Sequence, residues 1–467
     1  MAISPAFSIA QRALLANESA LGVVSNNIAN VNTPGFTRQI PEFASDLPVP
    51  LNGVLVGSGA HIRTVRQVLD SLLDGRLLGS ETDLRQRSAL RDQLGALAGV
   101  VNDLDTPSLA STLGGFFDAA EALGRNPAGL AERQTLLGRA TALAAGLNQR
   151  HGDIAALQRG ADDRYVSVAN GANGALQKIA TLNTAIVASE SGSQQANELR
   201  DQRRQAVTDL AGVLGISTLD HADGSLTVFA RNGLVLVDAG SVVHPLAVTE
   251  SGVGLDGAPL HQAGIPDPAG GSAISVPGAF ATGELAGLAQ ARDQYLPAAA
   301  TALDTFAVAL RDQVNAIQTD PAALDLDGNS TAAAPLFGGT GAGDLNVLIT
   351  DPRQLAAALS AQPGDNQNAL RLADLRTAPL AALGGVPFTG FLAAQQGQVG
   401  EAAAGAQDAA AARDGLHQQL ANQRASLSGV NLNEELTNLI KFQRAFQAAS
   451  KVISAVDATL QELLNAV

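Results

Sequence analysis

The sequence predicts a mainly α fold with a small β insertion, in which an elongated helical body carries two heptad helices formed by the ends of the chain. Apolar residues at both ends recur at alternating spacings of three and four. Most of the remaining sequence keeps the 3.6-residue period of amphipathic helices, and only residues 216–280 show the two-residue period of strands. We therefore expect one β unit inserted into a helical chain.

The composition bounds the function. The 467 residues leave room for about two to four domains. The formal net charge of −15 argues against a broad phosphate-binding surface, so nucleic acid is not an expected partner. The chain has no cysteine, which excludes disulfides, thiolate metal sites and cysteine nucleophiles. No apolar run is long enough to span a membrane, and residues 1–20 do not resemble a cleaved signal peptide, so we expect no membrane partner.

The first heptad helix is expected over about residues 7–31. An amphipathic core helix is the alternative that this pattern alone leaves open. Asn17 is the one polar member of the stripe and is of the kind that fixes register in coiled coils. The predicted seam consists of Phe7, Ala10, Leu14, Asn17, Leu21, Val24, Ile28 and Val31.

The second heptad helix is expected at the other end of the chain, where only Glu435 interrupts the apolar spacing. Neither stripe has an apolar partner next to it in sequence. The two stripes are therefore expected to pair as an inner coiled-coil layer, or to bind copies in neighbouring molecules, and to form the subunit interface. The second seam consists of Leu432, Leu439, Phe442, Phe446, Ala449, Ile453, Val456, Leu460, Leu463 and Val467.

The chain between the two ends is expected to be helical as far as about residue 214. Asn126 and Pro127 have the residue types of an N-cap and a first helical turn, which predicts a helix from there to about Gln149. The other predicted helices cover residues 68–101, 153–189 and 194–214.

The β unit begins with a predicted hairpin. Ser225–Ala230 and Leu234–Val237 flank the turn sequence Arg231-Asn232-Gly233. A further strand is expected at Val242–Thr249, and residues 251–278 are expected to be loop. Helix then resumes over residues 283–317, short irregular helices fill 320–386, and a last Ala/Gln-rich helix covers about 388–426.

Side chains that carry chemistry form no recognisable site. The six histidines have no metal-ligand spacing. Asp325, Asp327 and Asn329 resemble part of a calcium loop, but the glycine and the closing glutamate of such a loop are missing, so turn chemistry explains them better. Residues 198–203 alternate acids with arginines and indicate a solvated, ion-paired helix face. We expect no metal, no cofactor and no enzymatic activity.

A turn follows the first heptad helix. Asparagine side chains can satisfy backbone groups where the helix ends, Pro34 forbids α geometry at Thr33, and Gly35 permits a positive φ. The residues of this turn are Asn30, Asn32, Thr33, Pro34, Gly35 and Phe36.

Both ends of the chain resemble a known family. Residues 26–36, Asn-Asn-Ile-Ala-Asn-Val-Asn-Thr-Pro-Gly-Phe, are similar to the amino-terminal signature of the bacterial flagellar rod, hook and hook-associated proteins. Residues 428–435 and 439–446, followed by Lys451-Val452-Ile453, are similar to the carboxy-terminal signature of that family. The resemblance marks Gln443, Arg444 and Lys451 as further motif residues. Phe36 and Phe446 stand where many relatives have tyrosine, so each keeps a ring and lacks a hydroxyl.

The middle of the chain resembles the hook-associated branch of the family, whose members form the junction between hook and filament. The resemblance covers about residues 1–320 and 395–467, whereas residues 321–390 are shorter than in members with additional outer β domains. The matching segments are Asn126-Pro127-Ala128, residues 133–138, 197–203 and 283–288, and the Asn232-Gly233 hairpin.

The resemblance implies a structural protein that leaves the cytoplasm through the flagellar type III apparatus and assembles as a ring on the hook tip of the extracellular flagellum, where it allows the flagellin filament to grow. The implied partners are further copies of the chain, the hook protein, the second junction protein and the filament proteins. An export chaperone that holds the C-terminal helix before secretion is also implied. The alternative is a hook or distal-rod protein, and a rod-associated peptidoglycan hydrolase would need a cleft that the sequence does not indicate.

The expected division is the following. Residues 1–36 form the N-terminal inner axial helix and turn, 37–215 the first part of a helical middle domain, 216–280 the small β domain, 281–320 the return of the helical domain, 321–390 an irregular Gly/Ala/Pro-rich segment, 391–427 the last helix of the helical domain, and 428–467 the C-terminal inner axial helix.

Overall fold

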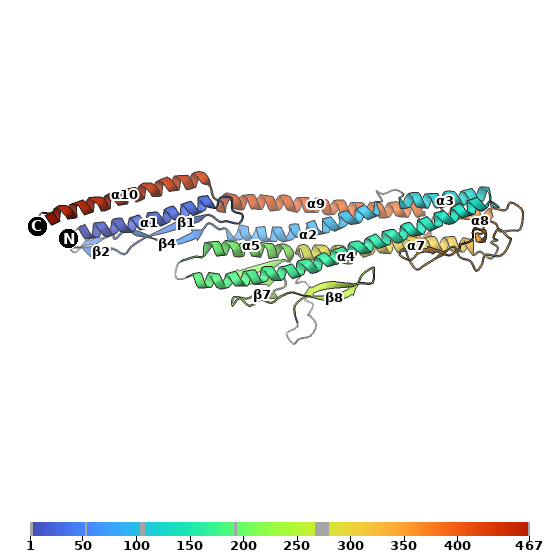
Figure 1. The fold of residues 1–467 in the computed structure, drawn as a ribbon, viewed down its shortest axis with the longest axis horizontal. Helices are drawn as coiled ribbons and strands as arrows, with labels where there is room; N and C mark the ends of the chain where they lie inside the picture. The colour runs from blue at the N-terminus through green and yellow to red at the C-terminus, as the bar shows by residue number, and fades with distance from the viewer. Residues whose placement is uncertain (1–2, 52–53, 103–107, 191–193, 267–279, 466–467) are drawn as a thin grey trace.

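The computed structural model describes residues 3–51, 54–102, 108–190, 194–266 and 280–465. It confirms a mainly α fold with small β-sheets, drawn out into an elongated body with both termini at one end (Figure 1). The α-helices are α1 (Ile3–Ala29), α2 (Ser71–Val101), α3 (Leu109–Arg125), α4 (Leu130–Ser189), α5 (Asn197–Val213), α6 (Gly283–Gln290), α7 (Leu296–Gln318), α8 (Gln367–Asp374), α9 (Phe388–Ser428) and α10 (Leu432–Asn465). One π-turn, Ala291–Tyr295, joins α6 to α7.

The strands form small antiparallel sheets, and the strands of each sheet lie close together in the sequence. Their order is β1 with β4, β2 with β3, β5-β6-β7, β8 with β9, and β10 with β11. The bounds are β1 (Gln39–Ser45), β2 (Val49–Leu51), β3 (Val54–Val56), β4 (Ala60–Gln67), β5 (Ile216–Asp220), β6 (Leu226–Ala230), β7 (Val235–Val237), β8 (Ala247–Val253), β9 (Pro259–Gly264), β10 (Phe337–Gly338) and β11 (Asn346–Val347).

Helices from distant parts of the sequence run side by side along the body. At one end of the body α1 packs against α10 (Figure 1). α9 lies in line with α10, packs along α2 and reaches toward the far end. α4, the longest helix with 60 residues, runs the length of the body and contacts α3, α5, α6 and α7. The chain therefore leaves the terminal end, builds the body, and returns along it through α9.

The region before α2 differs from the expectation. Helix was expected from residue 37 onward, but residues 39–51 and 54–67 contain the paired strands β1 to β4, of which β1 and β4 contact α1. Pro41 and Pro50 lie in this stretch, and proline removes the backbone donor that a helix interior needs. Asp70 then caps α2, since its carboxylate accepts hydrogen bonds from the N–H groups of Leu72 and Leu73 at 3.0 and 3.1 Å.

The expected helix start at Asn126 is also wrong. Asn126 is the C-cap of α3, and α4 begins at Leu130 after the cap residue Gly129. Asparagine suits either end of a helix, because its short side chain bonds nearby backbone groups at both. The two helices expected over 127–149 and 153–189 are one continuous helix, α4, which runs through Gly152 without a break.

The β unit contains the expected hairpin and two strands that were not expected, β5 and β9. β6 and β7 enclose the predicted turn, where Gly233 has a φ of 88°. The strand expected at 242–249 begins only at Ala247, and the stretch expected to be loop contains β9, which pairs with β8. The part of that expected loop over residues 267–279 lies outside the described residues.

The far end of the body is closed by the irregular segment between α7 and α9. Its leucines, together with Phe337 and Phe388, pack into one apolar core with α3, α4 and α7. Phe116 and Phe117 lie 5.3 Å apart between ring centroids, as do Phe306 and Phe388. Asn368 holds the segment in place by donating hydrogen bonds to the carbonyls of Ile317 and Ala356. Each large apolar side chain that is buried here stabilises the fold by about 1.5–3 kcal/mol, so the segment forms a stable cap although its helices and strands are short.

Candidate assembly surface and its junction with the body

The inner pair, by which we mean α1 and α10, is antiparallel, because α1 ends where α10 begins (Figure 1). Among the side chains of α1 that the structure describes, the buried ones are mostly small, namely Ala10, Ala16, Ala20, Val24 and Asn27. On α10 only Glu435 and Ala449 are buried among its described side chains. The pair therefore packs around alanines and leaves most large apolar side chains at its margin.

The predicted seam residues lie in three degrees of burial within the single chain. Val24 is buried; Leu14, Leu21, Ile28, Val31, Leu439, Phe442, Phe446, Ile453 and Val456 are half-buried; Phe7, Leu432 and Leu460 are exposed. The side chain of Leu463 and all of Val467 lie outside the described residues.

A large part of the apolar surface of the inner pair is uncovered. Leu15 on α1 and Leu436, Ile440 and Val452 on α10 are between 46% and 54% exposed. Together with the exposed seam residues they form an apolar surface on both helices of the pair. Leu432, Leu436 and Ile440 follow one another at a spacing of four and so form one exposed apolar stripe on α10, which is typical of interaction surfaces in soluble proteins.

The turn after α1 has the geometry that its residues predict. The N–H of Thr33 donates to the Asn30 carbonyl at 2.9 Å, the N–H of Phe36 donates to the Thr33 carbonyl at 3.2 Å, and Gly35 has a φ of 81°. Asn32 and Pro34 are exposed, and Phe36 is half-buried. The motif residues Gln443, Arg444 and Lys451 are exposed on α10. None of these side chains points to a site within the chain.

The residues that join the two ends are neighbours of those predicted. Asn27 makes two hydrogen bonds with the backbone of Gln39, at 2.8 and 3.0 Å, and its amide also donates to the Glu435 carboxylate at 3.0 Å. Arg38 donates to the same carboxylate from Nε at 2.8 Å and pairs with Glu434 at 2.6 Å. Its backbone N–H donates to the carbonyl of Ser428, the last residue of α9, at 2.9 Å.

The same turn is bound to the body through α5. Asp201 accepts hydrogen bonds from the N–H and the hydroxyl of Thr37, at 2.9 and 2.8 Å, and pairs with Arg204 at 2.6 Å. Glu198 accepts from Asn26 at 3.1 Å and from the side chain of Gln39 at 2.9 Å. Burial raises the pKa of Glu198, but these hydrogen bonds outweigh it and leave the pKa lowered.

The expectation of a solvated, ion-paired face over residues 198–203 holds for the exposed Glu198 and Gln202 and for the ion pair of Arg200 with Glu190. It is wrong for Asp201 and Arg203. Asp201 is 8% exposed and Arg203 only 4%. Arg203 donates to the Asn183 side chain at 2.8 Å and to the Gly224 carbonyl at 2.7 Å, which ties α5 to α4 and to the turn before β6. Burial lowers the pKa of this guanidinium to about 10. Helix periodicity does not reveal these contacts, because the partners come from other segments.

The polar residue expected to set register also differs from the one that joins the helices. Asn17 donates to the carbonyl of Ala13 in its own helix, at 2.6 Å. The side-chain hydrogen bond between α1 and α10 runs instead from Asn27 to Glu435. The signal was present in the sequence as the one interruption of the second seam.

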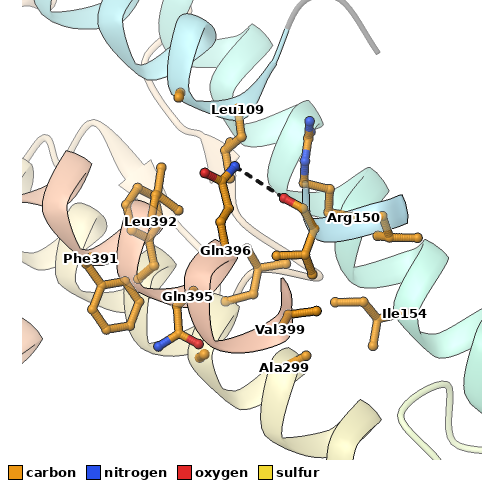
Figure 2. Close-up of a pocket in the computed structure, with 15 residues that line it drawn as sticks. Leu109, Arg150, Ile154, Ala299, Phe391, Leu392, Gln395, Gln396 and Val399 are labelled. Atoms are coloured by element: carbon orange, nitrogen blue, oxygen red, sulfur yellow. Dashed lines mark hydrogen bonds between the residues drawn. The ribbon is translucent and has the colours of Figure 1, made fainter. Parts of the chain in front are cut away.

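The body holds an apolar pocket, but its lining carries no constellation for catalysis. It lies between α2, α3, α4, α7 and α9 and is lined by residues that include Leu109, Ile154, Phe391 and Val399 (Figure 2). Gln396 closes one side by donating to the carbonyl of Val101 at 3.3 Å, and Arg150 is the one ionisable residue of the lining. Among the described residues, no group of three or more His, Asp or Glu lies close enough to hold a metal ion. No helix in the described ranges is long and apolar enough to cross a membrane.

Comparison with known proteins agrees with this architecture. The family model of the flagellar hook-associated protein FlgK helical domain matches residues 94–337. Models of the flagellar basal body rod FlgEFG protein C-terminal region and of the flagella basal body rod protein match residues 421–466 and 7–37.

Two relatives match over nearly the whole chain, and a third matches a short part of it. The flagellar hook-associated protein 1 of Escherichia coli K12 is 26% identical over 98% of each chain. The Bacillus subtilis protein of the same name is 24% identical over 98% of this chain and 97% of its own. The flagellar hook protein FlgE of Helicobacter pylori is 40% identical, but over only 19% of this chain and 11% of its own.

A solved structure shares the fold. The flagellar hook junction protein FlgK from Burkholderia pseudomallei superposes with a TM-score of 0.65 and 15% sequence identity, and the match covers 76% of this chain and all of that one. The helical-domain model covers just over half of the 467 residues, and the rod-family models match both ends. The chain therefore belongs to the FlgK family of flagellar hook-associated proteins.

Proposed function

We propose that this protein is the structural component of the bacterial flagellum that assembles on the hook tip and forms the junction on which the flagellin filament grows. The observation that carries the proposal is the half-covered inner pair at one end of an elongated body. A chain that functioned alone would gain stability by covering these side chains. The full-length match to the hook-associated proteins 1 supports the position in the axis.

The subunit interface in this proposal is the surface of the inner pair. The predicted seam residues of residues 7–31 and 432–463 contact neighbouring subunits with the sides that α1 and α10 leave uncovered. The inner layer then comprises residues 1–36 and 428–467, and the remaining segments form the helical body, the β unit and the cap at the far end. The proposed role is mechanical: the body joins the subunit lattice of the hook to that of the filament.

The partners follow from the same surface. Further copies of the chain lie beside the inner pair, the hook protein lies below it, and the second junction protein and the filament proteins lie above it. Before export, the exposed side chains of Leu436 and Ile440 on α10 offer an apolar helix face that fits an export chaperone. The protein is then cytoplasmic before export and part of the extracellular flagellum afterwards.

A hook or distal-rod protein is the second candidate. It is favoured by the two rod-family models at the ends of the chain and by the 40% identity to the hook protein of Helicobacter pylori. That identity covers 19% of the chain, whereas the helical-domain model covers residues 94–337. The match of the helical body to the hook-associated family therefore favours the junction role over a hook or rod role.

A strain that lacks the gene distinguishes the two candidates. The junction role predicts complete hooks without filaments in electron micrographs, and flagellin monomers in the culture medium. A hook or rod role predicts cells without hooks. Restoration of filaments by the wild-type gene on a plasmid is the control.

A further inference from the structure

Three distant segments of the chain meet at one polar junction. Residues 26–39 are the end of α1 and the turn after it, residues 197–204 begin α5, and residues 428–435 include the end of α9 and the start of α10. The hydrogen bond from Asn27 to Glu435 joins residues 408 positions apart, and the one from Asn26 to Glu198 joins residues 172 apart. Each segment overlaps a stretch that resembles the family, so these three matching stretches are in physical contact with one another.

Glu435 is the least expected residue of this junction. Its side chain is 2% exposed and occupies a place in the apolar stripe of α10. Burying a carboxylate is unfavourable unless charged and hydrogen-bonding partners replace water. Arg38 and Asn27 supply these partners, at 2.8 and 3.0 Å. A seam that only buried apolar area would be served better by leucine at this position.

The partners of Glu435 are themselves fixed to the body. Arg38 is bound through its backbone to the end of α9, and Asn27 is bound through two hydrogen bonds to Gln39. The side chain of Gln39 in turn donates to Glu198 on α5. A displacement of α10 relative to the body would break charge-assisted hydrogen bonds in a region shielded from water, where they are strongest.

We infer that Glu435 is a positioning residue: through Asn27 and Arg38 it holds the inner pair at one orientation to the body. We call these three side chains the terminal latch. The inference deepens the proposed function and rests on it for its consequence, which is that inner pair and body can engage their layers of the assembly together. The latch itself is a property of the single chain and is testable without flagella.

The test measures how often the junction is closed. Because the chain has no cysteine, the pair Asn26→Cys and Glu198→Cys is the sole site for a short bis-maleimide cross-linker. Both positions lie outside the three side chains of the terminal latch, and every variant is compared in this one background, in which the hydrogen bonds of Glu198 with Asn26 and Gln39 are absent. In this full-length background Glu435→Leu should slow intramolecular cross-linking at least about tenfold, because one partner of a buried ion pair is removed. Glu434→Leu is the matched control, since Glu434 also pairs with Arg38 but its side chain is 56% exposed. It should change the rate less than about twofold.

A conservative variant separates positioning from helix formation. Glu435→Gln keeps the shape and an acceptor for Asn27 but removes the charge that pairs with Arg38, so it should slow cross-linking by an intermediate factor. It also answers the question if Glu435→Leu does not fold. Circular dichroism should show unchanged helix content in every variant. An unchanged or faster rate in both Glu435 variants would overturn the latch, because a packing role alone predicts that leucine strengthens the pair.

The flagellar readout is independent of the cross-linking. Plasmid-borne Glu435→Leu should be secreted by the deletion strain and leave hooks without filaments, whereas Glu434→Leu should restore filaments. If cross-linking slows as expected but the deletion strain has normal filaments, the latch stands and the proposed function fails. If cross-linking is unaffected while the deletion strain has bare hooks, the proposed function stands and the latch fails.

Discussion

Asp201 is the carboxylate that holds the turn after α1 on the body, and its removal gives a local and measurable effect. Thr37 is fully buried, and both its N–H and its hydroxyl donate to Asp201, which also pairs with Arg204. Asp201→Ala leaves the Thr37 N–H without an acceptor and a half-buried guanidinium without its nearest carboxylate. Hydrogen bonds to a charged group contribute about 1.5–3 kcal/mol each, so we expect a loss of about 3 kcal/mol or more at this contact.

Amide hydrogen exchange of the purified full-length protein measures that loss at the right place. At about 1.4 kcal/mol per tenfold change, exchange at Thr37 should accelerate about a hundredfold, while peptides from the middle of α4 keep their protection. Asp209→Ala is the control, because Asp209 lies exposed on the same helix and accepts a hydrogen bond from Gln205 in that helix rather than from the turn after α1. Unchanged exchange at Thr37, or an equal loss across α4, would refute the argument.

Three further predictions concern the inner pair, the pH dependence of the junction and the packing of the body. Leu439→Asp should prevent assembly on hooks while the helical body of the purified protein keeps its unfolding temperature. Gln177→Asp, at an exposed position of α4 in the body, should assemble normally, and filament counts by electron microscopy compare the two variants. Because the pKa of Glu198 is lowered in the folded protein, its charge stabilises the fold fully above the ordinary value of 4.5, and this stabilisation is lost as the pH falls through the lowered pKa. Glu198→Gln should therefore destabilise the protein at neutral pH and become indistinguishable from wild type in strong acid. A difference in urea midpoints that stays constant across this pH range would contradict the prediction. Gly287→Ala should destabilise the fold by about 2 kcal/mol or more, because the added Cβ would lie 2.3 Å from the Gln86 carbonyl oxygen. Gly138→Ala, which has open space around it in α4, should stabilise the fold by about 0.5–1 kcal/mol, and thermal unfolding of the two variants measures both effects.

The sequence was most informative where structure depends on local periodicity. The heptad stripes of residues 7–31 and 432–463 predicted the terminal helices, and the Asn232-Gly233 pair predicted the hairpin of β6 and β7, because spacing and turn chemistry act within a few residues. The strands of residues 39–67 were missed, since their short alternation is broken by prolines and by charged residues on the exposed face. β9 was missed for a related reason: glycines at 252, 254 and 257 indicate loop until a partner strand is present.

The junction was beyond local reasoning because its partners are far apart in sequence. Glu435 was recognised as the interruption of a seam, and residues 198–203 as a charged helix face, but nothing local states that the two lie at one place. Only the return of α9 along α2 brings residue 435 back to Asn27 and Arg38. An isolated polar residue within an apolar stripe is nevertheless a usable signal, since a buried carboxylate requires partners somewhere in the chain.

The central claim is that α1 and α10 form the inner layer of the assembly and that their uncovered sides contact neighbouring subunits. Electron cryomicroscopy of isolated flagella, with the zone between hook and filament resolved, tests it most directly. The account predicts a ring of these chains in that zone, with the inner pair at the smallest radius, Leu436 and Ile440 covered by adjacent subunits, and the body outside. A zone without this protein, or a ring in which the inner pair faces solvent while the body makes the axial contacts, would contradict it.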